Sequence, residues 1–108
     1  MLTIRGATEQ GKADVVLDTG FTGELTLPPA AITALALPLD HYRPATLADG
    51  SITLMTVYKA VVEWDGTARS VDVLESEGIP LLGTSLLDGC EVLIEFKEGG
   101  RVVVTRLA

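Results

Sequence analysis

Residues 13–20 read Ala-Asp-Val-Val-Leu-Asp-Thr-Gly, an apolar run that ends directly on the tripeptide Asp18-Thr19-Gly20. The run over 13–17 predicts a buried strand, because short apolar segments bounded by turn residues are typical of sheet interiors. Before it, Leu2–Arg5 alternates apolar and polar residues and predicts another strand, and 6–12 resembles a turn. Asp-Thr-Gly alone is a short motif, so its meaning depends on the elements around it.

Downstream of the tripeptide the chain continues with short elements. Leu25–Leu27 predicts a short strand, and Pro29–Ala36 predicts a helix, since proline is favoured in a first helical turn. Ile32 and Leu35 would form the buried side of this helix. The polar segment through Pro44 predicts a loop.

Two Asp-Gly dipeptides predict consecutive β-hairpins in the middle of the chain. Asp49-Gly50 lies between predicted strands 45–48 and 51–63, and Asp65-Gly66 joins the longer strand to 69–74. Asp-Gly favours two-residue hairpin turns because both central residues take positive φ. The longer strand exceeds its first partner in length, so we expect the first hairpin to project as a free tip.

The last part of the chain contains three further signals. Leu81-Leu82-Gly83 predicts a short apolar strand. Thr84 is a candidate N-cap for one turn of helix that ends at Gly89. The segments 91–96 and 101–106 predict a closing hairpin. Together these elements favour a mostly β, closed or orthogonal structure.

Composition narrows the class of protein. A chain of 108 residues without repeats or linkers predicts one domain over 1–108. The formal charge of −7 and the absence of a basic cluster argue against nucleic-acid binding. We expect no membrane segment, since no apolar run is long enough to span a bilayer, and the N-terminus lacks the apolar core of a signal peptide. The expected location is the cytoplasm.

Single cysteine and histidine residues exclude several kinds of site. Cys90 is alone, which predicts a small buried residue rather than a disulfide or a cysteine-based metal site. His41 is alone in a polar segment and is interpreted as a surface residue, which argues against a Ser-His or Cys-His hydrolase. No metal and no cofactor are expected.

The order of these parts resembles the retropepsin-like (clan AA) aspartic proteases, in particular the small bacterial and archaeal type. The likeness covers nearly the whole chain and is carried by residues 18–28, 47–51, 62–66 and 81–89. It implies a retropepsin-like closed β-barrel, half of a pepsin, with one or two short helices. Relatives often carry part of a first strand upstream of residues such as Leu2.

The resemblance also assigns roles to individual residues. It implies that Asp18 is the catalytic carboxylate, that Thr19 ties its loop to a symmetry mate, and that Gly20 lets backbone approach. Leu82 and Gly83 would belong to the strand that threads behind this loop. The tip of a flap over the substrate would consist of Ala48, Asp49, Gly50 and Ser51.

Hydrolysis of an amide by carboxylates requires two of them around one water and one shared proton. The chain has one Asp-Thr-Gly, so the second aspartate must come from another copy across a two-fold axis. The sequence therefore predicts a homodimeric aspartic endopeptidase acting on peptide or protein substrates.

Two departures from the family pattern support an alternative. Phe21 stands where retroviral enzymes and pepsins have a small residue, so it either fills a subsite or packs inward, and the flap contains only Gly50 as glycine. The alternative is a non-catalytic dimeric peptide-binding module with the protease fold. Trp64 is interpreted as a packing residue, with an interface role as the other possibility. The remaining acidic residues are interpreted as turn or surface residues: Asp14, Asp49, Asp65, Asp88 and Glu95.

Overall fold

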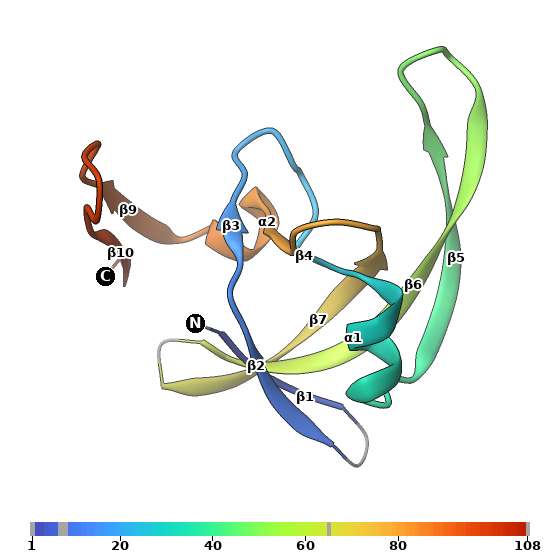
Figure 1. Ribbon diagram of the computed structural model, residues 1–108, viewed down its shortest axis with the longest axis horizontal. Coiled ribbons are helices and arrows are strands. Elements are labelled where there is room, and N and C mark those ends of the chain that lie inside the picture. Colours follow the sequence, from blue (N-terminus) through green and yellow to red (C-terminus); the bar gives the residue numbers. More distant parts are fainter. Residues whose placement is uncertain (1, 7–8, 65, 108) are drawn as a thin grey trace.

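The computed structural model describes residues 2–6, 9–64 and 66–107. The fold is mostly β, as predicted, with two short helices (Figure 1). The strands are β1 (Leu2–Arg5), β2 (Gln10–Ala13), β3 (Val16–Leu17), β4 (Leu25–Leu27), β5 (Leu39–Thr46), β6 (Ile52–Trp64), β7 (Thr67–Glu75), β8 (Leu81–Leu82), β9 (Cys90–Ile94) and β10 (Val102–Arg106). The helices are α1 (Pro29–Ala34) and α2 (Thr84–Leu87).

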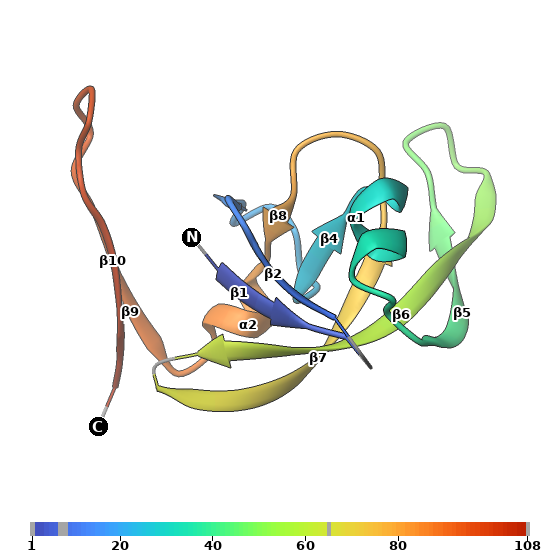
Figure 2. The same ribbon diagram turned by 60° about the horizontal axis from the view of Figure 1, so that its bottom comes forward.

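One curled sheet forms the body of the molecule, with strand order β2-β1-β6-β7-β4-β8-β3 and β5 added to β6. Strands β6 and β7 curve beneath β4 and α1 (Figure 2). The sheet is a half-barrel rather than the closed barrel that was predicted, because β2 and β3 at its two ends do not pair among the described residues. The predicted buried strand over 13–17 is divided, because the chain leaves the sheet at Asp14 and Val15: Ala13 ends β2, and β3 keeps only two residues.

The core lies inside this curl. Strands β6 and β7 contribute residues of alternating burial. Ile32 of α1 and Leu35 directly after it cover them and are buried as predicted. Each fully buried aliphatic side chain stabilises the fold by about 1.5–3 kcal/mol. The core cluster consists of Leu2, Ile4, Leu25, Leu27, Ile32, Leu35, Leu37, Ala60, Val62, Val71, Val73, Leu82 and Leu86.

Both helices are shorter than predicted. Helix α1 ends at Ala34 instead of Ala36, because Leu35 closes the last turn and Ala36 takes a left-handed φ of 50°. Helix α2 ends at Leu87 instead of Gly89. Its N-cap is Gly83, so the prediction that Thr84 caps the helix was wrong. None of the helices in the described part of the chain is long and apolar enough to cross a membrane.

Three strand predictions need correction. The predicted turn over 6–12 contains most of β2, which pairs with β1. The segment through Pro44 is part of β5 rather than a loop. Within the described part of the chain β5 pairs with β6 alone, and an edge strand tolerates the missing N–H of proline. The first hairpin turn is a loop over 47–51 rather than a two-residue turn, since Thr46 pairs with Ile52.

Other predictions are confirmed. Strands β1, β4 and β8 lie where the sequence placed them. Strand β6 pairs with β5 over residues 52–58 and with β7 over residues 57–64, so the outer part of the β5–β6 hairpin projects from the body as expected (Figure 1). The second hairpin pairs Trp64 with Thr67, and Asp65 of the predicted Asp-Gly turn lies outside the described residues.

The chain ends in the predicted hairpin, formed by β9 and β10 as a separate two-stranded sheet. Figures 1 and 2 both show it standing beside the body, beyond α2.

Candidate active site

Asp18 follows β3 directly and lies in a loop that is closed by short hydrogen bonds. Its backbone N–H donates to the carbonyl oxygen of Leu82 at 3.0 Å, and its own carbonyl accepts the N–H of Phe21 at 3.1 Å. The N–H of Gly20 donates to Oδ1 of Asp18 at 2.8 Å. The half-buried carboxylate is therefore oriented by its own loop.

Strand β8 lies behind this loop and holds it in place through strand pairing. It pairs in parallel with β3 and antiparallel with β4, so Leu82 lies opposite both Leu17 and Leu25. Leu82 is 3% exposed. The three residues of β4 are all buried, and Leu82 of β8 is buried with them, so burial rather than strand length holds this arrangement together. Of the predicted supporting strand, Leu82 lies in β8 behind the Asp18 loop, whereas Gly83 lies outside β8 and is the N-cap residue of α2.

Beyond β8 the chain continues to donate to the same loop. The N–H groups of Gly83, Thr84 and Ser85 donate to the carbonyl oxygens of Glu24, Phe21 and Gly23, respectively, at 2.9–3.2 Å. The hydroxyl of Thr84 also donates to the carbonyl oxygen of Phe21, at 3.3 Å. The first turn of α2 is therefore attached to the segment that follows Asp18.

Glycine is required where these two segments touch. A Cβ on Gly83 would lie 2.2 Å from the carbonyl oxygen of Gly23 and 2.6 Å from the ring of Phe21. A Cβ on Gly23 would lie 2.5 Å from the same ring. The half-buried Phe21 therefore packs with its ring against two glycines, which favours the interpretation that it packs inward. A Cβ on Gly20 would lie 3.2 Å from Oδ1 of Asp18, a tight contact.

The predicted flap tip is the exposed loop between β5 and β6. Leu47 donates to the carbonyl oxygen of Ser51 at 2.7 Å, and Gly50, with a φ of 86°, donates to that of Leu47 at 2.9 Å. Asp49 accepts hydrogen bonds from the N–H and hydroxyl of Ser51, which lower the pKa of Asp49. Asp49 is thus a turn former, as interpreted from the sequence, and Ala48 lies exposed beside it.

A charged cluster joins the flap base to the active-site loop, and sequence reasoning missed it. Asp72 on β7 pairs with Arg43 of β5 at 3.1 Å and with Lys59 of β6. The hydrogen bond from Lys59 lowers the pKa of Asp72, and that of Lys59 is raised in return. The N–H of Asp72 donates to Oε1 of Glu24 at 3.0 Å, and Glu24 follows the Asp18 loop.

Arg69 completes this connection at the other end of β7. Its guanidinium lies 3.5 Å from Oε2 of Glu24 and reaches the carbonyl oxygens of Ser85 and Leu86 at the same distance. No sequence motif indicates these pairs, because they depend on the register of β5, β6 and β7. The sequence offers one signal for Asp72, the alternation of residues along β7. This alternation puts the Asp72 side chain on the other face of the sheet from the buried Val71 and Val73.

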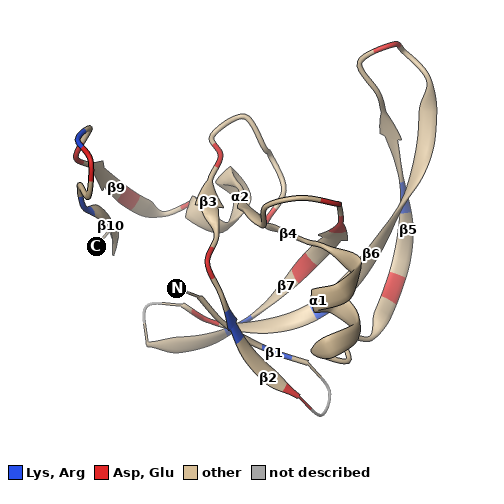
Figure 3. Cartoon of the chain, viewed as in Figure 1, with Lys and Arg blue, Asp and Glu red and all other residues tan. Residues whose placement is uncertain are grey.

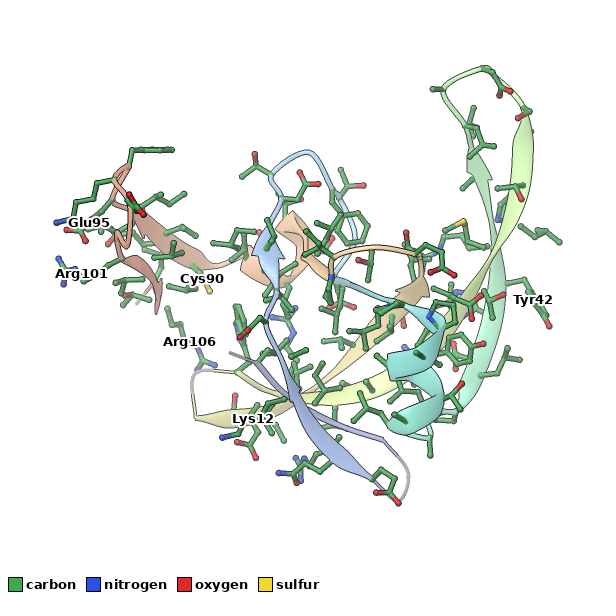
Figure 4. The ribbon with its side chains drawn as sticks, viewed as in Figure 1. Lys12, Tyr42, Cys90, Glu95, Arg101 and Arg106 are labelled. Carbon is green, nitrogen blue, oxygen red and sulfur yellow. The ribbon has the colours of Figure 1, made fainter. Side chains whose placement is uncertain are left out.

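The other residues considered from the sequence lie elsewhere. His41 contacts its neighbour Asp40, with Nδ1 and Oδ2 2.5 Å apart. Glu95 pairs with Arg101 across the terminal hairpin, and Cys90 is a half-buried free cysteine near the start of β9 (Figure 4). Trp64 packs against the core. Within the described ranges, no three His, Cys, Asp or Glu residues gather in a way that could hold a metal ion.

The arrangement presents one oriented carboxylate on a fastened loop and a projecting hairpin that arises from the same sheet. Thr19 is exposed beside Asp18. Its predicted contact is with the same loop in a second copy of the chain, so this role stays a prediction. Comparison of the chain with protein-family models, with curated proteins and with solved structures finds no match.

Proposed function

We propose that the chain is one subunit of a homodimeric aspartic endopeptidase with a retropepsin-like fold. One observation carries the proposal: Asp18 lies at the end of β3, oriented by the N–H of Gly20 and fastened to β8 through Leu82. A catalytic acid or base needs a fixed position relative to its substrate, and the hydrogen bond from Gly20 supports this by orienting the carboxylate within its loop. A two-fold axis beside the loop would bring the Asp18 residues of two copies together.

Two such carboxylates perform the chemistry of peptide hydrolysis. In this mechanism the two carboxyl groups hold one water between them and share one proton, so that one Asp18 acts as the base and the other as the acid. The ionised Asp18 accepts a proton from water as the water oxygen attacks the carbonyl carbon, and the protonated Asp18 donates to the carbonyl oxygen. The C–N bond then breaks as the Asp18 that took the proton from water passes it to the amide nitrogen, and the other Asp18 takes a proton back from a hydroxyl of the tetrahedral intermediate. No group outside the dimer is required.

The flap suggests how the substrate is held. An extended peptide between the Asp18 pair and the β5–β6 hairpins would form backbone hydrogen bonds in the manner of an added strand. Leu47, Ile52 and Leu54 are 47%, 72% and 67% exposed on the hairpin, which favours apolar side chains in the substrate. The alternative, a peptide-binding module without turnover, loses one of its two arguments because Phe21 packs on Gly23 and Gly83.

Cleavage of a diverse peptide library, followed by mass spectrometry from acidic to neutral pH, tests the proposal. The wild type should cut peptides, and Asp18→Asn should reduce the rate by at least about a hundredfold without changing the circular dichroism spectrum. Asp14→Asn, an exposed aspartate four residues earlier, is the matched control and should retain full activity. Undiminished cleavage by Asp18→Asn would overturn the assignment.

A further inference from the structure

A pocket of about 190 Å³ lies where β1, β6 and β7 run side by side. The side chains that border it come from these three strands and from the segment between α1 and β5: Arg5, Pro38, Lys59, Ala60, Val61 and Ser70. None of these residues belongs to the Asp18 loop or to the flap tip. The pocket is therefore a feature separate from the candidate active site.

The register of the strands brings three polar side chains to this pocket. Arg5 lies opposite Val61, and Val61 lies opposite Ser70, so the three side chains share one face of the sheet. Val62, the next residue of β6, is fully buried, so the shared face is the one turned away from the core. Lys59 lies on the same face, two residues from Val61, and is diagonal to Arg5 at a backbone separation of about 7–8 Å.

Arg5 differs from the other half-buried basic residues. Lys59 pairs with Asp72 and Arg69 with Glu24, whereas no ion pair or side-chain hydrogen bond within the described part of the chain involves Arg5. Its Nε atom is buried and has no hydrogen-bond partner there. A charged donor that is buried without an acceptor is costly, so it indicates an acceptor from outside the chain.

The local charge at the pocket is opposite in sign to that of the whole chain. The chain carries a net charge of −7, yet the described residues that border the pocket include two basic residues and no acidic one. Asp72, which contacts Lys59, also pairs with Arg43, so two cations share this one carboxylate. Figure 3 shows basic residues on β1, β2 and β6, where these strands lie together and away from the loop that follows β3. An anion is thus favoured here.

We propose that this pocket binds a small oxyanion, the carboxylate or phosphate group of a small molecule. The guanidinium of Arg5 presents parallel N–H groups to two oxygens of such a group, as arginine does in bidentate contacts. The ammonium of Lys59 has three donors, of which Asp72 accepts one, and the hydroxyl of Ser70 lies on the same face. The pocket is smaller than the pockets of about 300–1,000 Å³ that hold drug-sized ligands, so it suits a group of few atoms.

This inference goes beyond the proposed function, because the site requires neither a second copy of the chain nor the carboxylate of Asp18. The anion would bridge β1 and β6, two strands that pair through two residues each. Binding to the folded chain should therefore raise its stability by mass action.

Titration of the full chain, followed by the amide signals in a two-dimensional NMR spectrum, tests the site. Sodium phosphate and sodium acetate are the two probes, and sodium chloride keeps the ionic strength constant. The amide signals of Arg5, Val61 and Ser70 should shift and saturate in the millimolar range. Arg5→Gln should weaken binding by at least about tenfold, because the charged bidentate contact is lost. Lys97→Gln is the matched control, since it removes the same charge at an exposed residue of the terminal hairpin, and it should bind like the wild type.

A second pair of variants tests the site without changing Arg5. Ser70 is exposed, so its replacement should not disturb the fold. Ser70→Asp places a negative charge beside the bound anion and should weaken binding by about tenfold. Ser70→Asn, of nearly the same size and uncharged, should stay within about threefold of the wild type.

The outcomes separate a built site from an adventitious ion only. Saturable binding of phosphate or of acetate that Arg5→Gln and Ser70→Asp weaken supports the site, and the probe that binds more tightly identifies the group. Shifts that grow linearly with salt, an equal response to sodium chloride, or unchanged affinity in both variants would each overturn it. Since no readout depends on peptide cleavage, a chain that binds the anion but cuts no peptide would overturn the peptidase alone.

Discussion

The Asp18 loop and the β5–β6 hairpin are both projections of one sheet, yet they are held in opposite ways. The loop over 18–24 is fastened to β8 and α2 by a series of backbone hydrogen bonds and by glycine contacts that leave no room for a methyl group. The tip over 47–51 is held by hydrogen bonds among its own residues, and the side chains beside it are exposed. The Asp18 loop is therefore held by the elements around it, whereas the tip of the β5–β6 hairpin is held only by hydrogen bonds within its own turn.

This difference matches what each region would do in a peptidase. A carboxylate that exchanges protons with water and substrate must hold its position, whereas a cover over the substrate must open and close. Projecting segments with few buried contacts open at low free-energy cost. The cluster of Glu24, Asp72, Arg43 and Lys59 lies between the two regions and ties the base of the hairpin to the fastened side.

The largest expected contrast is in the packing of the two regions. Leu25 is fully buried beside β8, so Leu25→Ala should lower the free energy of unfolding by about 3 kcal/mol through lost burial and a residual cavity. Leu54 on the flap is 67% exposed, and Leu54→Ala should change stability by less than about 0.5 kcal/mol. Urea denaturation measures both. If both variants lost the same free energy of unfolding, Leu54 would be as well packed as Leu25, which would contradict its exposed position on the hairpin.

A smaller effect concerns the glycine contact behind Asp18. Gly83→Ala should destabilise the fold by about 2 kcal/mol, because the added Cβ meets a backbone carbonyl and the Phe21 ring. Gly11→Ala is the matched control, since its Cβ meets only the flexible end of Leu35 at 3.0 Å. Thermal unfolding of both variants compares them. A Gly83→Ala protein as stable as Gly11→Ala would contradict the tight attachment of the loop.

The smallest expected effect belongs to the charged cluster between the regions. The pKa of Asp72 is lowered by Lys59, so its contribution to stability is present above the ordinary aspartate pKa of 3.8 and is lost as pH falls toward the lowered value. Asp72→Asn should cost about 1 kcal/mol near pH 7, since Arg43 and Lys59 are more than a third exposed.

The pH dependence of that loss is the sharper observation. The difference in unfolding free energy between wild type and Asp72→Asn should shrink when urea denaturation is repeated below pH 3. A difference that stays constant with pH would mean that Asp72 acts through packing rather than through its charge.

Sequence reasoning identified most elements but not how they join. Apolar runs and Asp-Gly dipeptides indicate local structure, so β1, β4, β8 and both central hairpins were predicted. The division between β2 and β3 at Asp14 depends on β2 pairing with β1, and no local signal marks it. Pro44 suggested a loop because nothing in the sequence shows that β5 is an edge strand.

The candidate site follows the same rule. Asp18 was placed at the end of a strand because an apolar run leads directly to it, and the backbone N–H of Asp18 bonds to Leu82 of β8. Phe21 could not be placed, since its position depends on two glycines that are 60 residues apart. The Asp72 cluster joins three strands and could not be predicted without their register.

The central claim is that one active site takes an Asp18 from each of two chains, and mixing subunits tests it most directly. Wild type and Asp18→Asn would be combined at constant total concentration, well above the dimer Kd, and allowed to exchange subunits before peptide cleavage is measured. Activity should vary with the square of the wild-type fraction, so an equal mixture should keep about a quarter of the full rate. A linear dependence, with about half of the rate in the equal mixture, would show that one chain suffices and would contradict the account.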